Sequence, residues 1–451
     1  MSPTAQLVEY IVGARTRALP DTALESAKHH FVDTLASIVS GSRLMPGQRG
    51  AEYARARCQS GPAVVIADGD GASEEFAALA NAMAAHADET DDTHELSKSH
   101  PGSSIVSTAL AVAQANGRNG TEMLRAIALG YDVGPRVNMS LWTDFAEIRK
   151  QRRGTPTISG MFGSAAAAAS LTELDETHVR YLLSYVAQQV SGMNSWKRDQ
   201  DHIEKAWVIA GWPAYGALLA LSLVCTGWTG VDDVFAGDPN FIDIVGDSPD
   251  PAQLIAELGT RFEVQRTHIK VHSVGSPAQA PVQALQSLIR QHELTDHQVA
   301  AVTVRLPAVL AHTVQRSRKM ANINLQYLMS VTLADGGLNF AAAHDDERFA
   351  RWDADGGDQR IQVIAEESWA PRRQAVVEVT TVGGRQLDCR VDPVRGAPDN
   401  PMSEAEVAEK AVGLMGPVLG DGRAAEVVKA AFDVDSDGGL DRLTALLGRT
   451  N

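Results

Sequence analysis

The chain has 451 residues, of which 44% are hydrophobic and 21% charged, and its formal net charge is −16 at pH 7. This length allows two or three domains with a large core. The acidic balance argues against nucleic acid or an anionic membrane as a partner. Three widely spaced cysteines predict neither a disulfide framework nor a zinc or iron–sulfur site. No run of apolar residues reaches the length of a membrane span and no signal region is recognised, so the predicted location is the cytoplasm.

The first 260 residues have the pattern of a helical domain. Alanine and leucine are abundant and aromatic residues make up only 5% of the chain, which favours helices over a sandwich or barrel. A short extended segment is predicted at 63–67. Amphipathic or apolar helices are predicted at 4–17, 20–40, 51–57, 74–87, 104–116, 120–139, 160–171, 176–192 and 203–225.

A second domain is predicted at 265–402 because the pattern changes there. Helices at 277–292 and 323–334 alternate with β-rich runs at 299–306, 361–365, 375–381 and 386–391. Val382-Gly383-Gly384 is typical of a hairpin turn, and Ser403 with Glu406 forms a capping box that opens further helices. The predicted fold is therefore mainly α, with a large helical domain from 1–264 and 403–451 and an inserted α/β domain.

The stretch 86–104, HADETDDTHELSKSHPGSS, has the residues of a proton-transfer site. His100 precedes Pro101, which favours an extended backbone at the histidine. The small residues that follow can open a helix whose N–H groups face an anion. Asp91 and Asp92 lie on the same loop and can orient the imidazole. The alternative is a solvated acidic loop with helix-capping residues.

Metal and nucleotide sites are not indicated. His94 and His100 do not have the spacing of a zinc-protease pair, and Asp433 to Gly438 resembles a calcium loop only at its start, since Thr444 stands where glutamate is needed. There is no Walker loop, no GxGxxG after a strand and no GxSxG elbow. No metal or cofactor is therefore expected.

Three other places carry candidate site residues. Lys205 precedes an apolar segment, where it either snorkels or has a specific role, since a cation is unfavourable at a helix start. In 266–272 we predict an extended segment. Its basic residues His268, Lys270 and His272 alternate on one face, either at a solvated strand edge or in a domain-boundary cleft. Tyr327 follows a polar helix start and is either a core tyrosine or an acid.

Together, and in this order, these residues resemble the MmgE/PrpD family of dehydratases, decarboxylases and epimerases. The resemblance covers essentially the whole chain. It rests on Asp91-Asp92-Thr93 with His100-Pro101-Gly102, GTPTISGMFGSAAAAA (154–169), Glu204-Lys205 with AGWPAYG, GWTGVDDVFAG (227–237), HIK at Lys270 with GSPAQAPVQAL (275–285), and NINLQY ending at Tyr327.

The resemblance implies a helical domain built from both ends of the chain, a smaller α/β lid, a homodimer and no cofactor. It places His100, Lys205, Lys270 and Tyr327 around one pocket together with Asp91. The residues expected near the substrate are Asp92, Thr93, Ser104, Thr155 and His272. Thr155 stands where many members have histidine, Glu89 stands where aspartate is usual, and the loop from Thr93 to His100 has one extra residue.

The function that follows is a cofactor-independent lyase, of hydro-lyase or decarboxylase type, or an isomerase or epimerase. Its substrate would be a small di- or tricarboxylic acid that loses a proton α to a carboxylate. His100 would be the base, Lys205 and Lys270 would stabilise the enolate-like species, and Tyr327 would donate a proton. The lid would close over the substrate, with Gly275 near its hinge. The alternatives are a non-catalytic dimeric paralogue that binds a polyanion and a metal-dependent hydrolase that uses Asp92, His94 and His100.

Overall fold

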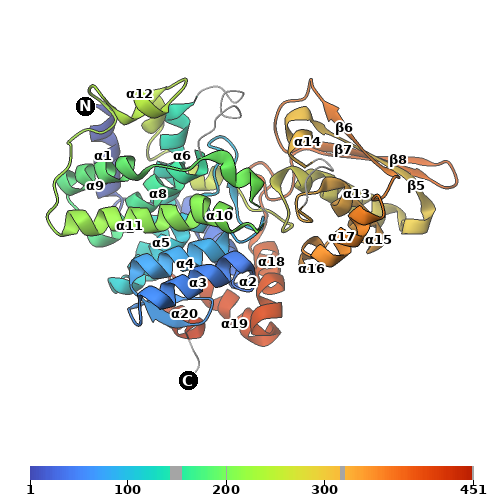
Figure 1. The fold of residues 1–451 in the computed structure, drawn as a ribbon. Coiled ribbons are helices and arrows are strands. Elements are labelled where there is room, and N and C mark those ends of the chain that lie inside the picture. The colour runs from blue at the N-terminus through green and yellow to red at the C-terminus, as the bar shows by residue number, and fades with distance from the viewer. Residues whose placement is uncertain (143–154, 200, 315–319, 449–451) are drawn as a thin grey trace. The chain divides into compact units, whose positions relative to one another are not determined.

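The computed structural model describes residues 1–142, 155–199, 201–314 and 320–448. The chain divides into two compact units, drawn in Figure 1. Unit 1 comprises Met1–Ala87, Asp91–Thr267 and Ser403–Asn451, and unit 2 comprises Asp88–Thr90 and His268–Met402. Unit 1 is helical and unit 2 combines helices with a sheet, which confirms the predicted mainly α fold with a smaller α+β part. Nothing in the sequence indicated that 88–90 would belong to unit 2.

Unit 1 is a stack of helices around an alanine-rich core. Its described helices are α1 (Pro3–Gly13), α2 (Asp21–Gly41), α3 (Met45–Arg57), α4 (Glu74–Ala85), α5 (Pro101–Ala115), α6 (Gly120–Leu141), α8 (Thr155–Thr172), α9 (Glu176–Gln189), α10 (Ile203–Ala206), α11 (Trp212–Cys225), α12 (Phe241–Val245), α18 (Glu404–Leu419), α19 (Asp421–Phe432) and α20 (Gly439–Leu447). Two short strands, β1 (Ala63–Val65) and β2 (Asp70–Ala72), form an antiparallel pair. The strands β3 (Thr93–His94) and β4 (Thr267–His268) have two residues each.

The ends of the helices follow their sequence signals. The predicted capping box at Ser403 is confirmed, and α18, which it opens, packs against α2 in Figure 1. The small residues of α8 also act as predicted, because they let α5 and α6 approach it closely. A Cβ added at Gly163 would lie 2.5 Å from Ile105 Cδ1 of α5 and 2.7 Å from the carbonyl oxygen of Gly130 in α6.

One prediction about the apolar segments was wrong. The run Ile203–Cys225 has 23 residues and a mean hydropathy of 1.8, so it is long and apolar enough to cross a membrane. By itself this is weak support for a membrane span, because 67% of the apolar window is buried inside the protein, as in a core helix. The run is also not one α-helix, since a π-helical turn at Trp207–Gly211 separates α10 from α11.

Unit 2 contains a mixed sheet with the strand order β6-β5-β7-β8. The strands are β5 (Val299–Pro307), β6 (Ile361–Glu366), β7 (Ala375–Thr381) and β8 (Gln386–Val391). β5 pairs parallel with β6 and antiparallel with β7, and β7 and β8 form the predicted hairpin around Gly383-Gly384. The helices are α13 (Gln279–His292), α14 (Ala308–Val314), α15 (Leu325–Ala334), α16 (Phe340–Ala343) and α17 (Asp346–Ala354).

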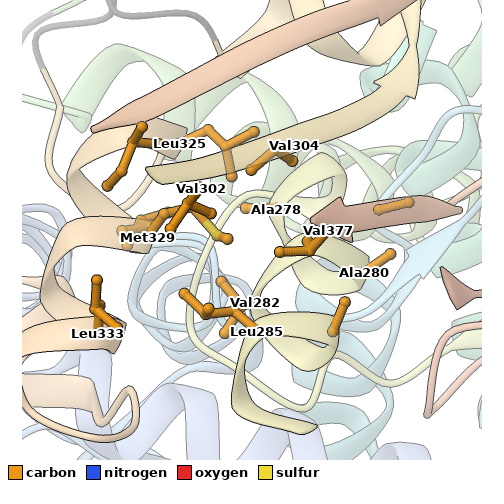
Figure 2. Packing of buried hydrophobic residues seen from close by; sticks show 14 of the residues in the cluster. Ala278, Ala280, Val282, Leu285, Val302, Val304, Leu325, Met329, Leu333 and Val377 are labelled. Atoms are coloured by element: carbon orange, nitrogen blue, oxygen red, sulfur yellow. The ribbon is translucent and has the colours of Figure 1, made fainter. Parts of the chain in front are cut away.

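Strand residues that alternate between the two faces of the sheet build the core of unit 2. Val302 and Val304 of β5 and Val377 of β7 are fully buried. Figure 2 shows them facing Val282 and Leu285 of α13 together with the side chains of α15. Unit 2 therefore has its own hydrophobic core, distinct from that of unit 1.

Candidate active site

The residues expected at the site divide between the two units. Unit 1 contains Asp91, Asp92, Thr93, His100, Ser104, Thr155 and Lys205, and unit 2 contains Lys270, His272 and Tyr327. Unit 1 thus carries the expected base with one of the two expected lysines, and unit 2 carries the other lysine.

His100 is the N-terminal cap residue of α5, with φ −117° and ψ 78°. Pro101 occupies the first turn of the helix, where its missing N–H removes no helical hydrogen bond. The proline ring disfavours a helical backbone at the residue before it, so His100 stays outside the helix. The histidine therefore lies at a helix start, as the sequence predicted.

The Nδ1 atom of His100 is anchored by the loop before it. It lies 2.8 Å from the main-chain oxygen of Asp92 and 3.3 Å from Oδ1 of Asp91. A carbonyl oxygen can only accept a hydrogen bond, so Nδ1 carries a proton. In the neutral ring the lone pair is then on Nε2. With 16% of its side chain exposed, His100 has the form of a general base that can be reached by a ligand.

His86, which follows α4, is a second imidazole at this place that the sequence analysis did not select. Its Nδ1 lies 2.7 Å from Oδ2 of Asp91, and its ring centroid is 4.9 Å from that of His100. Burial lowers the pKa of His86 and outweighs the opposing effect of the Asp91 carboxylate, while Lys205 and His100 lower it further. His86 is therefore a neutral donor to Asp91. The available signal was its position as the first residue of the acidic stretch.

The carboxylate of Asp92 holds other elements of unit 1. Oδ1 accepts the main-chain N–H of Gly102 at 3.0 Å, and Oδ2 accepts the hydroxyl of Tyr131 at 2.6 Å. Oδ2 also lies 2.8 Å from Nδ1 of His30. Burial and the neighbouring Asp92 charge raise the pKa of Tyr131 well above its usual value, so this tyrosine stays a donor. Of the two aspartates, Asp91 thus places its carboxylate on His100, and Asp92 acts on it through the main chain.

Lys205 lies in α10 and is only 9% exposed. Its main-chain N–H donates to Oδ2 of Asp199 at 3.0 Å, and its ammonium nitrogen lies 5.6 Å from the ring centroid of Trp196. The Lys205 charge is one of the causes that lower the pKa of His86. The lysine and the imidazole pair therefore share one electrostatic environment within unit 1.

Three further expected residues have different surroundings. Thr93 is buried in β3. Ser104 is fully buried in α5 against α8, where a Cβ added at Gly160 would lie 2.7 Å from Ser104 Oγ. Thr155 is the first residue of α8, and its side chain is outside the described part of the structure.

His94 forms a separate buried network. Its Nδ1 lies 2.8 Å from Ser97 Oγ and its Nε2 lies 3.1 Å from Oε2 of Glu263. The pKa of Glu263 is lowered to about 2. Burial alone would raise it, but the hydrogen bond and charge of His94 and the charges of Arg266 and Arg136 outweigh that effect. His94 is thus engaged on both nitrogens. This arrangement does not match the predicted alternative of a metal held by Asp92, His94 and His100.

In unit 2, Lys270 is tied to Glu89. Its ammonium group donates to the main-chain oxygen of Glu89 at 2.9 Å and lies 3.7 Å from the carboxylate. Lys270 is 3% exposed. Glu89, which stands where aspartate is usual in the family that the sequence resembles, is therefore a direct neighbour of Lys270.

The predicted extended segment across 266–272 forms a β-strand only at Thr267–His268. Glu263–Arg266 is a 3-10 turn, and strand geometry is confined to Thr267–His268. The main chain of His272 instead exchanges hydrogen bonds with Gln279, whose side chain accepts from its N–H and donates to its carbonyl. Alternation of basic residues is a weak strand signal when a side-chain amide downstream captures the backbone.

Tyr327 is fully buried in the core of unit 2. Its hydroxyl donates to the carbonyl oxygens of Ala342 and Asp345, at 3.1 and 3.4 Å. Its ring packs edge-on against Phe349 and Trp352. Burial raises the pKa of Tyr327 to about 12.

His344 and Asp88 form a pair in unit 2 that the sequence analysis missed. Nε2 of His344 lies 2.9 Å from Oδ2 of Asp88, and Nδ1 of His344 lies 2.9 Å from the carbonyl oxygen of Phe340. Asp88 also accepts the N–H and the hydroxyl of Thr90, both at 2.8 Å. No local pattern connects residues so far apart in the sequence.

His86, Asp91 and His100 are also the residues that could hold a metal. One potential ligand atom from each lies within 4.8 Å of the others. Imidazole and carboxylate together suit zinc and other divalent transition metals. In this structure, however, Nδ1 of each ring acts as a hydrogen-bond donor, to Asp91 in His86 and to the Asp92 carbonyl oxygen in His100.

Comparisons with known proteins identify two family domains and several relatives. The MmgE/PrpD N-terminal domain matches residues 5–254 and the MmgE/PrpD C-terminal domain matches residues 272–434. The chain is 23% identical to a cis-aconitate decarboxylase-like protein, oryM, of Aspergillus oryzae over 68% of this chain and 67% of the relative.

Two cis-aconitate decarboxylases are also similar. The human enzyme is 24% identical over 76% of this chain and 73% of its own length, and that of Aspergillus terreus is 22% identical over 64% and 60%. At these identities the relatives support a lyase-type enzyme in general. Since the N-terminal family domain alone covers more than half of the residues and the C-terminal domain most of the rest, the protein belongs to the MmgE/PrpD family.

Proposed function

We propose that this protein is a cofactor-independent lyase or isomerase that removes a proton α to a carboxylate of a small di- or tricarboxylic acid. The observation that carries the proposal is the anchoring of His100. Its Nδ1–H is held by the Asp92 carbonyl oxygen at 2.8 Å, which leaves Nε2 as the basic atom. An imidazole titrates near neutral pH, where a base for this reaction must work.

Asp91 supplies the charge that this base needs. When Nε2 of His100 takes a proton, the ring becomes an imidazolium cation. The Asp91 carboxylate, 3.3 Å from Nδ1, then stabilises that cation. A buried carboxylate beside a histidine serves catalytic bases in the same way in other enzymes.

The lysines are proposed to stabilise the product of proton removal. A carbanion next to a carboxylate places a second negative charge on the carboxylate group, so it needs cations that are held in advance. Lys205 in unit 1 and Lys270 in unit 2 are both nearly buried. The Trp196 ring, with its centroid 5.6 Å from the Lys205 ammonium, adds a cation–π contact that helps to hold this charge in place.

The reaction branch stays open within this proposal. The names of the relatives favour decarboxylation of cis-aconitate, in which loss of carbon dioxide leaves a carbanion that then takes up a proton. Elimination of water and epimerisation begin instead with removal of the α proton. Thr155 stands where many members of the family have histidine, which favours a reaction other than dehydration of 2-methylcitrate. A homodimer is part of the proposal and can be checked by light scattering.

The test is proton NMR of the purified protein in D2O with cis-aconitate, citrate, 2-methylcitrate, malate, tartrate and iminodisuccinate. Deuterium at an α carbon, with or without loss of water or carbon dioxide, is expected for at least one acid. His100→Asn is the matched variant, because its amide can still donate to the Asp92 carbonyl while the basic Nε2 is gone. It should abolish exchange.

Two results would contradict the proposal. Exchange at the wild-type rate in His100→Asn would remove His100 from the reaction. Absence of exchange with every acid, together with thermal stabilisation by one of them, would favour the binding-only paralogue. Metal analysis with a chelator control addresses the hydrolase alternative, since an activity lost to chelator and restored by a metal would require a metal-based mechanism.

A further inference from the structure

The Asp91 carboxylate lies between two imidazoles of unit 1. Oδ2 is 2.7 Å from Nδ1 of His86, and Oδ1 is 3.3 Å from Nδ1 of His100. The side chains of His86 and Asp91 are fully buried, whereas that of His100 is 16% exposed. The row His86–Asp91–His100 therefore runs from the interior towards the accessible end of the site.

The 2.7 Å contact between His86 and Asp91 shows which ring nitrogen of His86 carries the proton. A carboxylate accepts, so His86 donates through Nδ1–H, and its Nε2 has no hydrogen-bond partner among the described residues. Burial keeps this ring neutral. A neutral donor can orient a carboxylate without adding a positive charge that competes for it.

We propose that His86 is a positioning residue, whose Nδ1–H fixes the rotation of the Asp91 carboxylate so that Oδ1 stays on His100. This inference rests on the proposed function of His100 as the base. The hydrogen bond at Oδ2 restrains the rotation of the carboxylate and so helps to keep Oδ1 at 3.3 Å from Nδ1 of His100. His86 thus acts through Asp91 and need not touch the substrate.

The hydrogen bond from His86 also affects how readily His100, beside Asp91, takes up a proton. When Nε2 of His100 carries a proton in addition to Nδ1, the Asp91 carboxylate faces an imidazolium cation. When the proton leaves, the carboxylate keeps its full charge with the neutral His100 beside it, and the hydrogen bond from His86 then matters most. His86 therefore favours the deprotonated pair, in which His100 can act as base.

Other charged or titratable groups near the pair must be held constant in the test. The first is Lys205 on α10, whose charge acts on His86. The second is His202, just before α10, whose ring centroid is 5.6 Å from that of His86. The third is Asp92, whose main-chain oxygen accepts the hydrogen bond from His100. None of them is changed by a substitution at His86, so a shift in titration reports the loss of the donor.

Two substitutions separate donation from packing. His86→Asn keeps an amide N–H near the place of Nδ1, whereas His86→Leu fills the space without a donor. His94→Gln is the matched control in the same loop. His94 is equally buried and lies 3.1 Å from the carboxylate of Glu263, in a network that does not include His100.

The measurements are the pH dependence of kcat/KM for the best acid and a ¹H–¹⁵N titration of the imidazoles, with the His100 signals assigned by His100→Asn. In His86→Leu we expect the acidic limb and the His100 titration to move to higher pH by about one unit, the effect of one hydrogen bond to a charged group. His86→Asn and His94→Gln should stay within a few tenths of a unit of wild type.

An unchanged titration in His86→Leu, or an equal shift in His94→Gln, would overturn the positioning role. The wild-type spectrum gives a second test that needs no variant, because His86 must show the Nδ1–H tautomer, and an Nε2–H tautomer would also overturn the proposal. Both spectra are independent of turnover. If no acid is converted but the shift is present, the proposed function fails while the role of His86 stands.

Discussion

Asp92 accepts the main-chain N–H of Gly102 at 3.0 Å, so one residue of the acidic loop binds the first turn of α5. The same residue holds His100 through its main-chain oxygen at 2.8 Å. Tyr131 of α6 donates to the other carboxylate oxygen of Asp92 at 2.6 Å. The orientation of the base therefore depends on how closely α5, α6 and the loop pack.

Gly102→Ala should disturb this junction. The added Cβ would lie 2.6 Å from both Thr34 Oγ1 and the Tyr131 hydroxyl, and 3.0 Å from Oδ1 of Asp92. Forcing extra volume into such a place costs about 1–3 kcal/mol of the free energy of unfolding. We expect a lower thermal midpoint together with a lower kcat/KM.

Gly413→Ala is the matched control. Gly413 is an exposed residue within α18, and a Cβ there would meet nothing within 4 Å. Alanine is favoured over glycine inside a helix by about 0.5–1 kcal/mol, so this variant should be slightly more stable and equally active. If Gly102→Ala behaves in the same way, the junction is not as tight as described.

Lys205→Met should reduce kcat/KM by at least ~100-fold, the loss measured when one group that stabilises a developing negative charge is removed. Methionine keeps the length and apolar stem of the side chain, so the fold should be retained. Lys197→Met is the control, because Lys197 lies 5.9 Å from the same Trp196 ring but is exposed. Equal losses in the two variants would point to the Trp196 contact rather than to a catalytic charge.

Much of the fold could be predicted because its signals are local. Helix capping at Ser403, the glycine turn at 382–384 and the alternation within β5 each depend on neighbours within a few residues. The segment 266–272 does not follow its local pattern. There the side chain of Gln279, seven residues downstream, takes up the main-chain hydrogen bonds of His272.

The candidate site was only partly predictable for the same reason. His100 carries a local signal, since Pro101 and the small residues after it define a helix start. His86 has no such signal, and its role depends on the fold of a loop that returns Asp91 to the end of α4. The pairing of His344 with Asp88 joins residues more than two hundred positions apart. Contacts of this kind are set by packing, which a single sequence does not reveal.

His344 should make the stability of unit 2 depend on pH. Burial opposes its charge, but the hydrogen bond and charge of Asp88 outweigh that effect and raise its pKa above the ordinary value. A raised pKa in the folded state stabilises the protein fully below about pH 6.5, the value for an unfolded histidine, and this contribution is lost as the pH rises through the folded pKa. We expect a contribution of about 1–3 kcal/mol at low pH.

The measurement is the thermal midpoint of wild type and His344→Gln between pH 5.5 and 9. Glutamine keeps a donor but cannot be protonated, so the difference between the two proteins should be largest at the acidic end and shrink above pH 6.5. Asp88→Asn removes the cause of the shift and should flatten the profile in the same way. A difference that grows with pH would show that the sign is wrong.

Tyr327→Phe decides between the core role and the acid role of this residue. The hydroxyl donates to the carbonyls of Ala342 and Asp345, and the pKa of about 12 opposes release of its proton at neutral pH. We therefore expect the free energy of unfolding to fall by about 1 kcal/mol, the usual value of such a hydrogen bond, and kcat to stay within a few-fold of wild type. A proton donor in the reaction would instead lose about 100-fold or more in kcat. Stopped-flow or NMR rates with the best acid, measured beside urea unfolding, separate the two outcomes, because only the catalytic role lowers kcat in protein that is still folded.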